Sequence, residues 1–182
     1  MVYMILIIDN GKGAQEVSAF LRVKNSVVKP NQITAKAAGY VISDGKLSKD
    51  SQKIIADLLK KTDKPVLGIG LGHAYVAAAF GAAIKENKRP HKQDSVAIKK
   101  PCPLLLDLKK VFTVMDECNY IFEELPENFS VAGLSSKHEF EVIQHAESPF
   151  FGVHFNPELG MEGRKVLDNF SRFINMWETH HK

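Results

Sequence analysis

The sequence is poor in the residues that mark disulfide-rich, metal-binding and membrane proteins. It has only two cysteines among 182 residues, Cys102 and Cys118, and they form neither a metal-binding spacing nor a disulfide framework. We therefore expect a reducing cytoplasm, no bound metal and no cofactor. No apolar run approaches the length of a membrane-spanning helix, and Met1–Asp9 lacks the basic start and cleavage site of a signal peptide. The prediction is a cytoplasmic protein without a membrane partner.

An excess of one charge is also missing. The 24 basic and 21 acidic residues are interspersed and leave a net charge of +3, which does not predict a nucleic-acid partner. The one basic cluster, Lys85–Gln93, is interpreted as a solvated loop in preference to a phosphate-binding patch. No repeat, low-complexity segment or linker divides the chain, so we expect a single domain over residues 1–182.

The first half of the chain alternates between apolar runs and helical patterns. Tyr3–Ile8, Gly39–Ser43 and Lys64–Gly70 have the continuous apolar character of strands buried on both faces. Apolar residues at helical spacing follow them over residues 14–24, 48–62 and 73–82, the second helix with Asp50 or Ser51 as its expected N-cap. This alternation predicts an α/β fold with a doubly wound, mostly parallel sheet flanked by helices.

The second half predicts short strands separated by turn residues, which would extend or flank the sheet as antiparallel strands. An amphipathic helix over Gly163–His180 closes the chain, with Val166, Phe170 and Ile174 on its apolar side. The expected strands cover residues 95–100, 109–115, 129–136, 139–146 and 150–155.

The segment "GIGLGH", Gly68–His73, has the pattern of a nucleophile elbow. In such an elbow a strand passes through a sharp turn with small neighbours into a helix, and the central residue is lifted above the strand ends. The N–H groups at the start of that helix can stabilise a developing oxyanion. The central residue here is Gly70, which has no side chain to offer as a nucleophile.

Two segments together resemble class I (triad-type) glutamine amidotransferases. "KPVLGIGLGHAYVAAAFG", Lys64–Gly81, is similar to the elbow of that family, and "FGVHFNPE", Phe151–Glu158, is similar to its second signature. "ILIIDNG", Ile5–Gly11, resembles the first strand, especially that of the archaeal-type GMP synthase glutaminase subunit. The resemblance covers nearly the whole chain and implies the flavodoxin-like fold of this family.

Carried over position by position, the resemblance places the family's nucleophilic cysteine at Gly70, its histidine at Asn156 and its glutamate at Glu158. Glycine cannot form a thioester, and asparagine does not titrate near neutral pH and cannot act as a general base. Two of the three triad positions are therefore replaced, and no catalytic residue is expected to be intact.

Further positions depart from the family in the same direction. Asp44 stands where the oxyanion loop of the family has glycine, and Ala74 stands where it has glutamine. A carboxylate at Asp44 would lie near the site of a developing oxyanion, which is unfavourable for catalysis. Where a small-molecule ligand could bind, the residues of the candidate crevice are Asp44, Gly45, Leu71, His73, Ala74 and His154.

Other residues offer no convincing replacement chemistry. Cys102 and Cys118 are expected to be passive thiols. His154 lies two residues before Asn156, so in an extended strand both would share a face, although a local hydrogen bond is the favoured interpretation for His154. A dinucleotide fingerprint is disfavoured because His73 stands where its third glycine is needed.

Three functions remain open. The leading hypothesis is a pseudoenzyme with the amidotransferase fold and a regulatory, binding or structural role, whose partner is a synthetase subunit of the ATP-pyrophosphatase type or a second copy of the chain. One alternative is a glutaminase subunit that supplies ammonia to a separate ATP-dependent synthetase such as GMP synthase. The other is a different hydrolase that uses Asp44, His154 or Glu158 in the same crevice.

Overall fold

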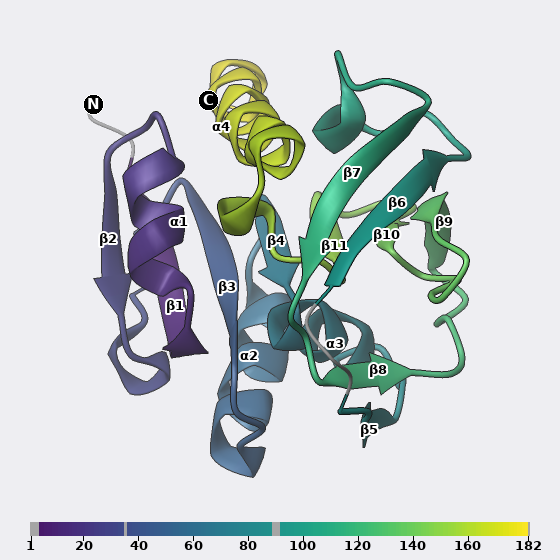
Figure 1. Ribbon diagram of the computed structural model, residues 1–182. Helices are drawn as coiled ribbons and strands as arrows, with labels where there is room; N and C mark the ends of the chain where they lie inside the picture. The colour runs from purple at the N-terminus through teal and green to yellow at the C-terminus, as the bar shows by residue number, and fades with distance from the viewer. Residues whose placement is uncertain (1–3, 35, 89–91, 182) are drawn as a thin grey trace.

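The computed structural model describes residues 4–34, 36–88 and 92–181, and a mixed sheet runs through it (Figure 1). Among these residues nine strands form the main sheet, in the order β2-β1-β3-β4-β11-β10-β9-β6-β7, and β5 pairs with β8 in a separate hairpin. The strands are β1 (Ile5–Lys12), β2 (Asn25–Val28), β3 (Gly39–Gly45), β4 (Val66–Ile69), β5 (Ile84–Glu86), β6 (Lys92–Ile98), β7 (Val111–Asp116), β8 (Tyr120–Phe122), β9 (Phe129–Leu134), β10 (Val142–His145) and β11 (Phe150–Val153). The helices are α1 (Ala14–Phe20), α2 (Lys49–Lys61), α3 (Leu71–Ala78) and α4 (Met161–His180).

The sheet changes character at β11. Strands β2, β1, β3, β4 and β11 are parallel to one another, and the pairs from β11 to β7 are antiparallel. The parallel part is built largely from the first half of the chain, and the antiparallel part comes from the second half. The predicted α/β class with a mostly parallel sheet and added antiparallel strands is therefore confirmed.

Helices cover both faces of the parallel part. Along β1, Ile5 and Ile7 belong to one hydrophobic cluster while Leu6 and Ile8 belong to another, because successive side chains of a strand point to opposite faces. The first cluster includes residues of α1 and α4, and the second includes residues of α2 and α3. Both cores hold the carboxyl ends of the parallel strands in place, which is where ligands bind in sheets of this kind.

Several element boundaries differ from those expected. The N-cap of α2 is Ser48, whose hydroxyl accepts a hydrogen bond from the Ser51 backbone N–H at 3.3 Å, so the prediction of Asp50 or Ser51 was wrong. The helix starts one residue after Ser48, because the cap must precede the first helical residue. Helix α3 begins at Leu71, two residues earlier than expected, and α1 ends at Phe20 because Leu21 is already extended.

The basic cluster Lys85–Gln93 is not one loop. Lys85 and Glu86 belong to β5, and Lys92 and Gln93 begin β6. Residues 89–91 of this cluster lie outside the described part of the chain. The short strands β2, β5 and β8 had no counterpart in the sequence prediction, because three or four residues are too few to show a strand pattern.

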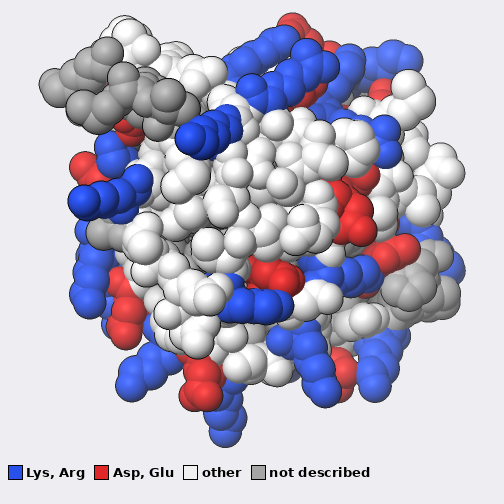
Figure 2. Space-filling view, turned by 90° about the vertical axis from the view of Figure 1, so that its left-hand side faces the viewer, with Lys and Arg blue, Asp and Glu red and all other residues white. Residues whose placement is uncertain are grey.

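Charged side chains of both signs share the surface. Figure 2 shows Lys and Arg side chains around the rim of one face, with Asp and Glu side chains between them and a broad uncharged area in the centre. In the part of the chain that the structure describes, no helix is both long enough and apolar enough to cross a membrane.

Candidate functional site

The turn between β4 and α3 has the backbone of a nucleophile elbow. Gly70 forms the turn with φ 57° and ψ −113°, a conformation that side chains of L-residues rarely adopt. The flanking glycines are required by close packing: a Cβ on Gly68 would lie 2.3 Å from the Gly72 carbonyl oxygen, and one on Gly72 would lie 2.0 Å from the Ile42 carbonyl oxygen. The strand, the turn and the helix can therefore approach one another only with small residues here.

The space above Gly70 is taken by a neighbouring side chain. A Cβ built on Gly70 would lie 2.5 Å from Cγ and 2.6 Å from Oδ1 of Asp44, which stands near the carboxyl end of β3. Any side chain at position 70 would thus compete with the Asp44 carboxylate for the same volume.

The Asp44 carboxylate is held by donors on several sides. Its Oδ1 accepts hydrogen bonds from the backbone N–H groups of Leu71 and Gly45, each at 2.9 Å. Its Oδ2 accepts a hydrogen bond from Asn156 Nδ2 at 3.1 Å, and Lys12 Nζ lies 3.9 Å from the same oxygen. An N–H of the residue after the nucleophile position and an N–H from a neighbouring loop are the usual donors of an oxyanion hole. Here a carboxylate of the chain itself occupies those donors.

Both the oxygen and the nitrogen of the Asn156 side-chain amide form hydrogen bonds. Its Oδ1 accepts a hydrogen bond from the Glu117 backbone N–H at 2.8 Å, and its Nδ2 donates to Asp44 and lies 3.4 Å from Glu158 Oε1. Its backbone N–H donates to the Met115 carbonyl at 2.8 Å, and the residue is fully buried. The side chain therefore ties the end of β7 to the elbow, a role that uses hydrogen bonds and no proton transfer.

Glu158 is a second buried carboxyl group beside Asp44. Burial raises its pKa to about 7, and the negative charge of Asp44 acts in the same direction, although the Asn156 amide partly offsets both. Gly13 leaves room for it, because a Cβ there would lie 2.5 Å from Glu158 Oε1. Unlike Asp44, this carboxyl group has only one long side-chain hydrogen bond from the described residues.

The connection between β7 and β8 lies next to the elbow, and Glu117 in this connection contacts Lys12 and Asn156. Lys12 Nζ lies 2.8 Å from Glu117 Oε2 and donates to the Glu117 carbonyl at 3.2 Å. The next residue, Cys118, is buried, and its thiol donates to the Tyr120 carbonyl at 3.3 Å. Burial raises the pKa of Cys118 well above its ordinary value, and the charge of Asp44 raises it further.

Cys102 is also buried, and burial raises its pKa to about 11. Cys102 and Cys118 form no disulfide bond and are free thiols in the structure. Thiols with raised pKa values hold little reactive thiolate at neutral pH. These properties favour the interpretation of both residues as passive.

His73 and His154, the two histidines of the candidate crevice, lie apart from the residues around Gly70. His154 follows the last residue of β11, and its Nε2 lies 3.2 Å from the Tyr120 carbonyl oxygen. Its ring centroid is 3.7 Å from that of His138 and 5.9 Å from that of His73. Burial lowers the pKa of His73 well below its ordinary value, and the nearby His154 and His138 act in the same direction.

The structure thus separates the predicted site residues into two groups. Asp44, Gly45, Leu71, Asn156 and Glu158 surround Gly70, whereas His73 and His154 lie with His138 and Asp116. Ala74 is buried in the first turn of α3, where its N–H donates to the Gly70 carbonyl at 3.2 Å. Sequence reasoning did not single out Asp116, Glu117 or His138 as site residues, because each is far from the elbow in the sequence.

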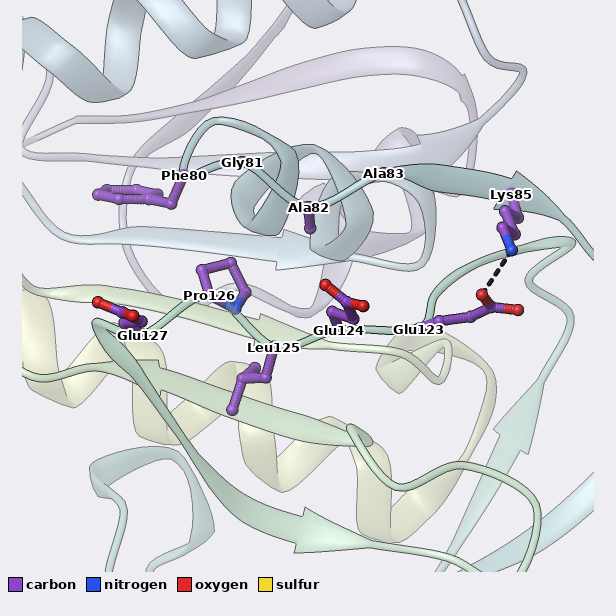
Figure 3. A pocket seen from close by; sticks show the side chains of 10 residues that line it. All are labelled: Phe80, Gly81, Ala82, Ala83, Lys85, Glu123, Glu124, Leu125, Pro126 and Glu127. Carbon is purple, nitrogen blue, oxygen red and sulfur yellow. Dashed lines mark hydrogen bonds and ion pairs between the residues drawn. The ribbon is translucent and has the colours of Figure 1, made fainter.

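A cavity of about 470 Å³ opens away from the elbow, between the turn after α3 and the loop after β8 (Figure 3). Phe80 lies at the α3 side, and Glu123, Glu124 and Glu127 come from the loop. The eight residues of α3, about 12 Å of helix, separate this cavity from Gly70. One ion pair, between Lys85 and Glu123, spans its rim (Figure 3).

Comparison with protein families finds one match over most of the chain. The family model described as "Glutamine amidotransferase class-I" matches residues 6–174. A subunit of the glutamine-hydrolyzing GMP synthase from Methanopyrus kandleri is 28% identical over 184 residues, covering 93% of this chain and 97% of its own. The protein of the same name from Methanothermobacter thermautotrophicus is 27% identical over 181 residues, with coverage of 93% and 97%.

Solved structures show the same fold. A crystal structure from Thermoplasma acidophilum, described provisionally as a GMP synthase subunit, has a TM-score of 0.91 at 22% identity and covers 99% of this chain and 98% of its own. The structure titled PurLQS, from Thermotoga maritima, has a TM-score of 0.77 at 14% identity and covers 95% of this chain and 99% of that chain.

Proposed function

The chain belongs to the class I glutamine amidotransferase family, and from this premise we propose that it is a pseudoenzyme of that family which does not hydrolyse glutamine. Its proposed role is to bind a synthetase-type partner or a small ligand through the retained scaffold. One observation carries the proposal: the Asp44 carboxylate occupies both the space above Gly70 and the N–H donors that would hold an oxyanion.

Glutamine hydrolysis has three requirements, and the positions that the family uses for them do not meet any of the three in this chain. A thiolate must attack the amide carbon, a base must move protons, and positive donors must stabilise the tetrahedral oxyanion. Gly70 supplies no thiol, and Asn156 is engaged as a neutral hydrogen-bonding residue. The two N–H donors already serve Asp44, so a substrate oxygen would have to displace a carboxylate from them.

The partner is proposed from the names of relatives. The similar GMP synthase proteins are subunits by name, and the PurLQS neighbour belongs to an assembly by its title. A synthetase subunit is therefore the proposed partner. The alternative, a glutaminase that supplies ammonia to such a synthetase, needs the chain to hydrolyse glutamine without the family's nucleophile.

The decisive measurement is the release of ammonia from glutamine. The purified unmodified chain is compared with a Gly70→Cys/Asn156→His variant and with a variant that carries Asp44→Gly in addition. We expect no release above buffer from the unmodified chain and none from the double variant, because Asp44 still occupies the oxyanion donors. We expect the triple variant to release at least about a hundredfold more ammonia than the double variant, the range that oxyanion stabilisation contributes.

The matched control is Asp44→Gly/Gly70→Ala/Asn156→His, which has the same open elbow but no thiol and should be inactive. Ammonia release by the unmodified chain far above buffer would overturn the pseudoenzyme proposal. If the triple variant is folded and inactive, the Asp44 carboxylate is not the main block, and adding Ala74→Gln then tests whether lost substrate contacts are responsible.

A further inference from the structure

Three side chains from distant parts of the sequence converge beside the elbow. Asp116 ends β7, His138 lies in the connection between β9 and β10, and His154 follows β11. One ligand atom from each lies within 4.8 Å of the others. Asp116 Oδ2 is 3.5 Å from His154 Nδ1 and 3.6 Å from His138 Nε2. All three side chains are at most 12% exposed.

The orientation of His154 is set by a backbone carbonyl. Its Nε2 lies 3.2 Å from the Tyr120 carbonyl oxygen, which can only accept, so Nε2 carries a proton. In the neutral ring the lone pair is then on Nδ1, and this atom faces Asp116 Oδ2, with Glu141 Oε2 at 3.9 Å. The Nδ1 lone pair and the carboxylate oxygens repel each other, and a cation between them removes this repulsion. The cation can be a proton on the ring or a metal ion. A backbone carbonyl that fixes the second ring nitrogen is also the usual support of a metal-binding histidine.

The distances from Asp116 to the two histidines fit a metal ion. Nitrogen and oxygen ligands lie about 2.0–2.1 Å from a tetrahedral zinc ion and therefore about 3.4 Å from one another. The two distances from Asp116 Oδ2 are within about 0.2 Å of this value. The rings of His138 and His154 lie partly over each other, with centroids 3.7 Å apart, so one of the two rings must turn for both nitrogens to face the same ion. We propose that Asp116, His138 and His154 bind one divalent transition-metal ion, Zn²⁺ in preference to Mg²⁺ or Ca²⁺, because imidazole nitrogen suits the former and all-oxygen sites suit the latter.

The surroundings provide support and access for such an ion. Glu141 is fully buried, and its Oε1 accepts a hydrogen bond from Ser135 Oγ at 2.7 Å, which leaves Oε2 directed toward the His154 side. A cavity of about 190 Å³ is lined by His138 and His154 together with His73, Lys137 and Phe140. The cavity gives the ion an entry path and leaves a fourth coordination position for water or a small anion.

The first experiment uses the unmodified full-length chain. After dialysis against a chelator, it is titrated with ZnCl₂ in competition with a chromophoric chelator, and separately with CoCl₂ while the visible spectrum is recorded. We expect one Zn²⁺ per chain and a Co²⁺ spectrum of four-coordinate nitrogen and oxygen ligation. Because this measurement needs no substitution in the cluster, failure of a variant to fold cannot obscure it. Absence of stoichiometric binding would overturn the proposal and leave a protonated histidine–carboxylate cluster.

The second experiment assigns the site. Asp116→Asn and His154→Gln keep the size and hydrogen-bonding capacity of each side chain while weakening ligation, and each should lower Zn²⁺ affinity at least about tenfold. The matched control is His180→Ala/His181→Ala, which removes an exposed histidine pair at the end of α4 and should leave affinity unchanged. If the control loses the ion and the cluster variants keep it, the binding is adventitious and the proposal fails. The measurement is independent of glutamine hydrolysis.

Discussion

Two carboxylates at the strand ends of this protein, the buried Asp44 and the mostly buried Asp116, are stabilised in opposite ways. Asp44 receives two backbone N–H groups and the Asn156 amide, so its charge is balanced by donors that are fixed in the fold. Asp116 faces two imidazole rings, whose nitrogens can carry a proton, bind a metal ion or do neither. The charge of Asp44 is therefore balanced by N–H donors whose protonation does not change. The charge of Asp116 is balanced only when the histidines carry a proton or bind a metal ion. The two proposals made above, an inactive elbow and a metal site beside it, rest on this difference.

The largest expected effect on stability comes from Gly70, and it tests whether the turn at Gly70 and the Asp44 carboxylate are energetically coupled. Gly70→Ala should lower the free energy of unfolding by about 2–4 kcal/mol, because of the positive φ and the collision with Asp44. In an Asp44→Gly background the same substitution should cost at least about 1 kcal/mol less. Chemical denaturation of the four proteins of this cycle measures the coupling.

Gly160→Ala is the matched control, because its φ is −135° and its Cβ would have an ordinary contact at 3.6 Å. It should change stability by less than about 0.5 kcal/mol. Additive effects of Gly70→Ala and Asp44→Gly would mean that the carboxylate and the turn are independent, and the contrast between the two regions would be lost.

The second effect concerns Glu158, the carboxyl group of the elbow that has few donors. Its pKa is raised from 4.5 to about 7, so the folded state holds a proton that the unfolded state releases. The contribution of Glu158 to the free energy of unfolding is therefore fully present below pH 4.5 and is lost as the pH rises through 7. The contribution lost between pH 5 and pH 8 is about 2 kcal/mol.

Glu158→Gln should remove this part of the pH dependence, as measured by denaturation at several pH values. The exposed Glu127→Gln serves as the control and should leave the profile unchanged. An unaltered profile in Glu158→Gln would show that this carboxyl group is ionised across the range and has donors that balance it as Asp44 does.

The smallest effect comes from Lys12, whose ammonium group lies 3.9 Å from Asp44 Oδ2 and pairs with Glu117. Its side chain is 36% exposed, so solvent screens both ion pairs. Lys12→Met should therefore lower the free energy of unfolding by less than about 1 kcal/mol, with the exposed Lys60→Met as its control. A loss above about 2 kcal/mol would show that Asp44 needs this cation as well as its backbone donors.

The sequence was sufficient for the fold and for the place of the elbow. The apolar runs before Asp9 and Gly70 predicted parallel strands, and the glycines around Gly70 predicted the sharp turn, since both depend on local pattern. It also predicted a carboxylate of Asp44 near the position of an oxyanion, and the structure places Asp44 next to Gly70. It could not show that this carboxylate would accept the very N–H groups of that site, because the register between β3 and β4 decides which atoms meet.

The histidine cluster was beyond prediction for a different reason. A local hydrogen bond was the favoured interpretation for His154, and its Nε2 does lie 3.2 Å from the Tyr120 carbonyl oxygen. Strand β11 ends at Val153, and His154 and Asn156 have different partners. His138 and Asp116 come from segments that no motif connects, and only the antiparallel part of the sheet brings them together. Ligand sets assembled from three distant segments leave no spacing in the sequence to read.

The position of Asp44 has a consequence for competition between ligands. Because the carboxylate is attached to the strand next to the N–H donors, its effective concentration there is fixed by the fold and does not depend on anything in solution. A ligand such as glutamine would have to compete with this fixed local concentration, and diluting the protein would not weaken the competition. Under the proposed function, Asp44 acts as a built-in competitor for these N–H groups, and a change of residue 44 or a rearrangement of its loop is what would make them available to another oxygen atom.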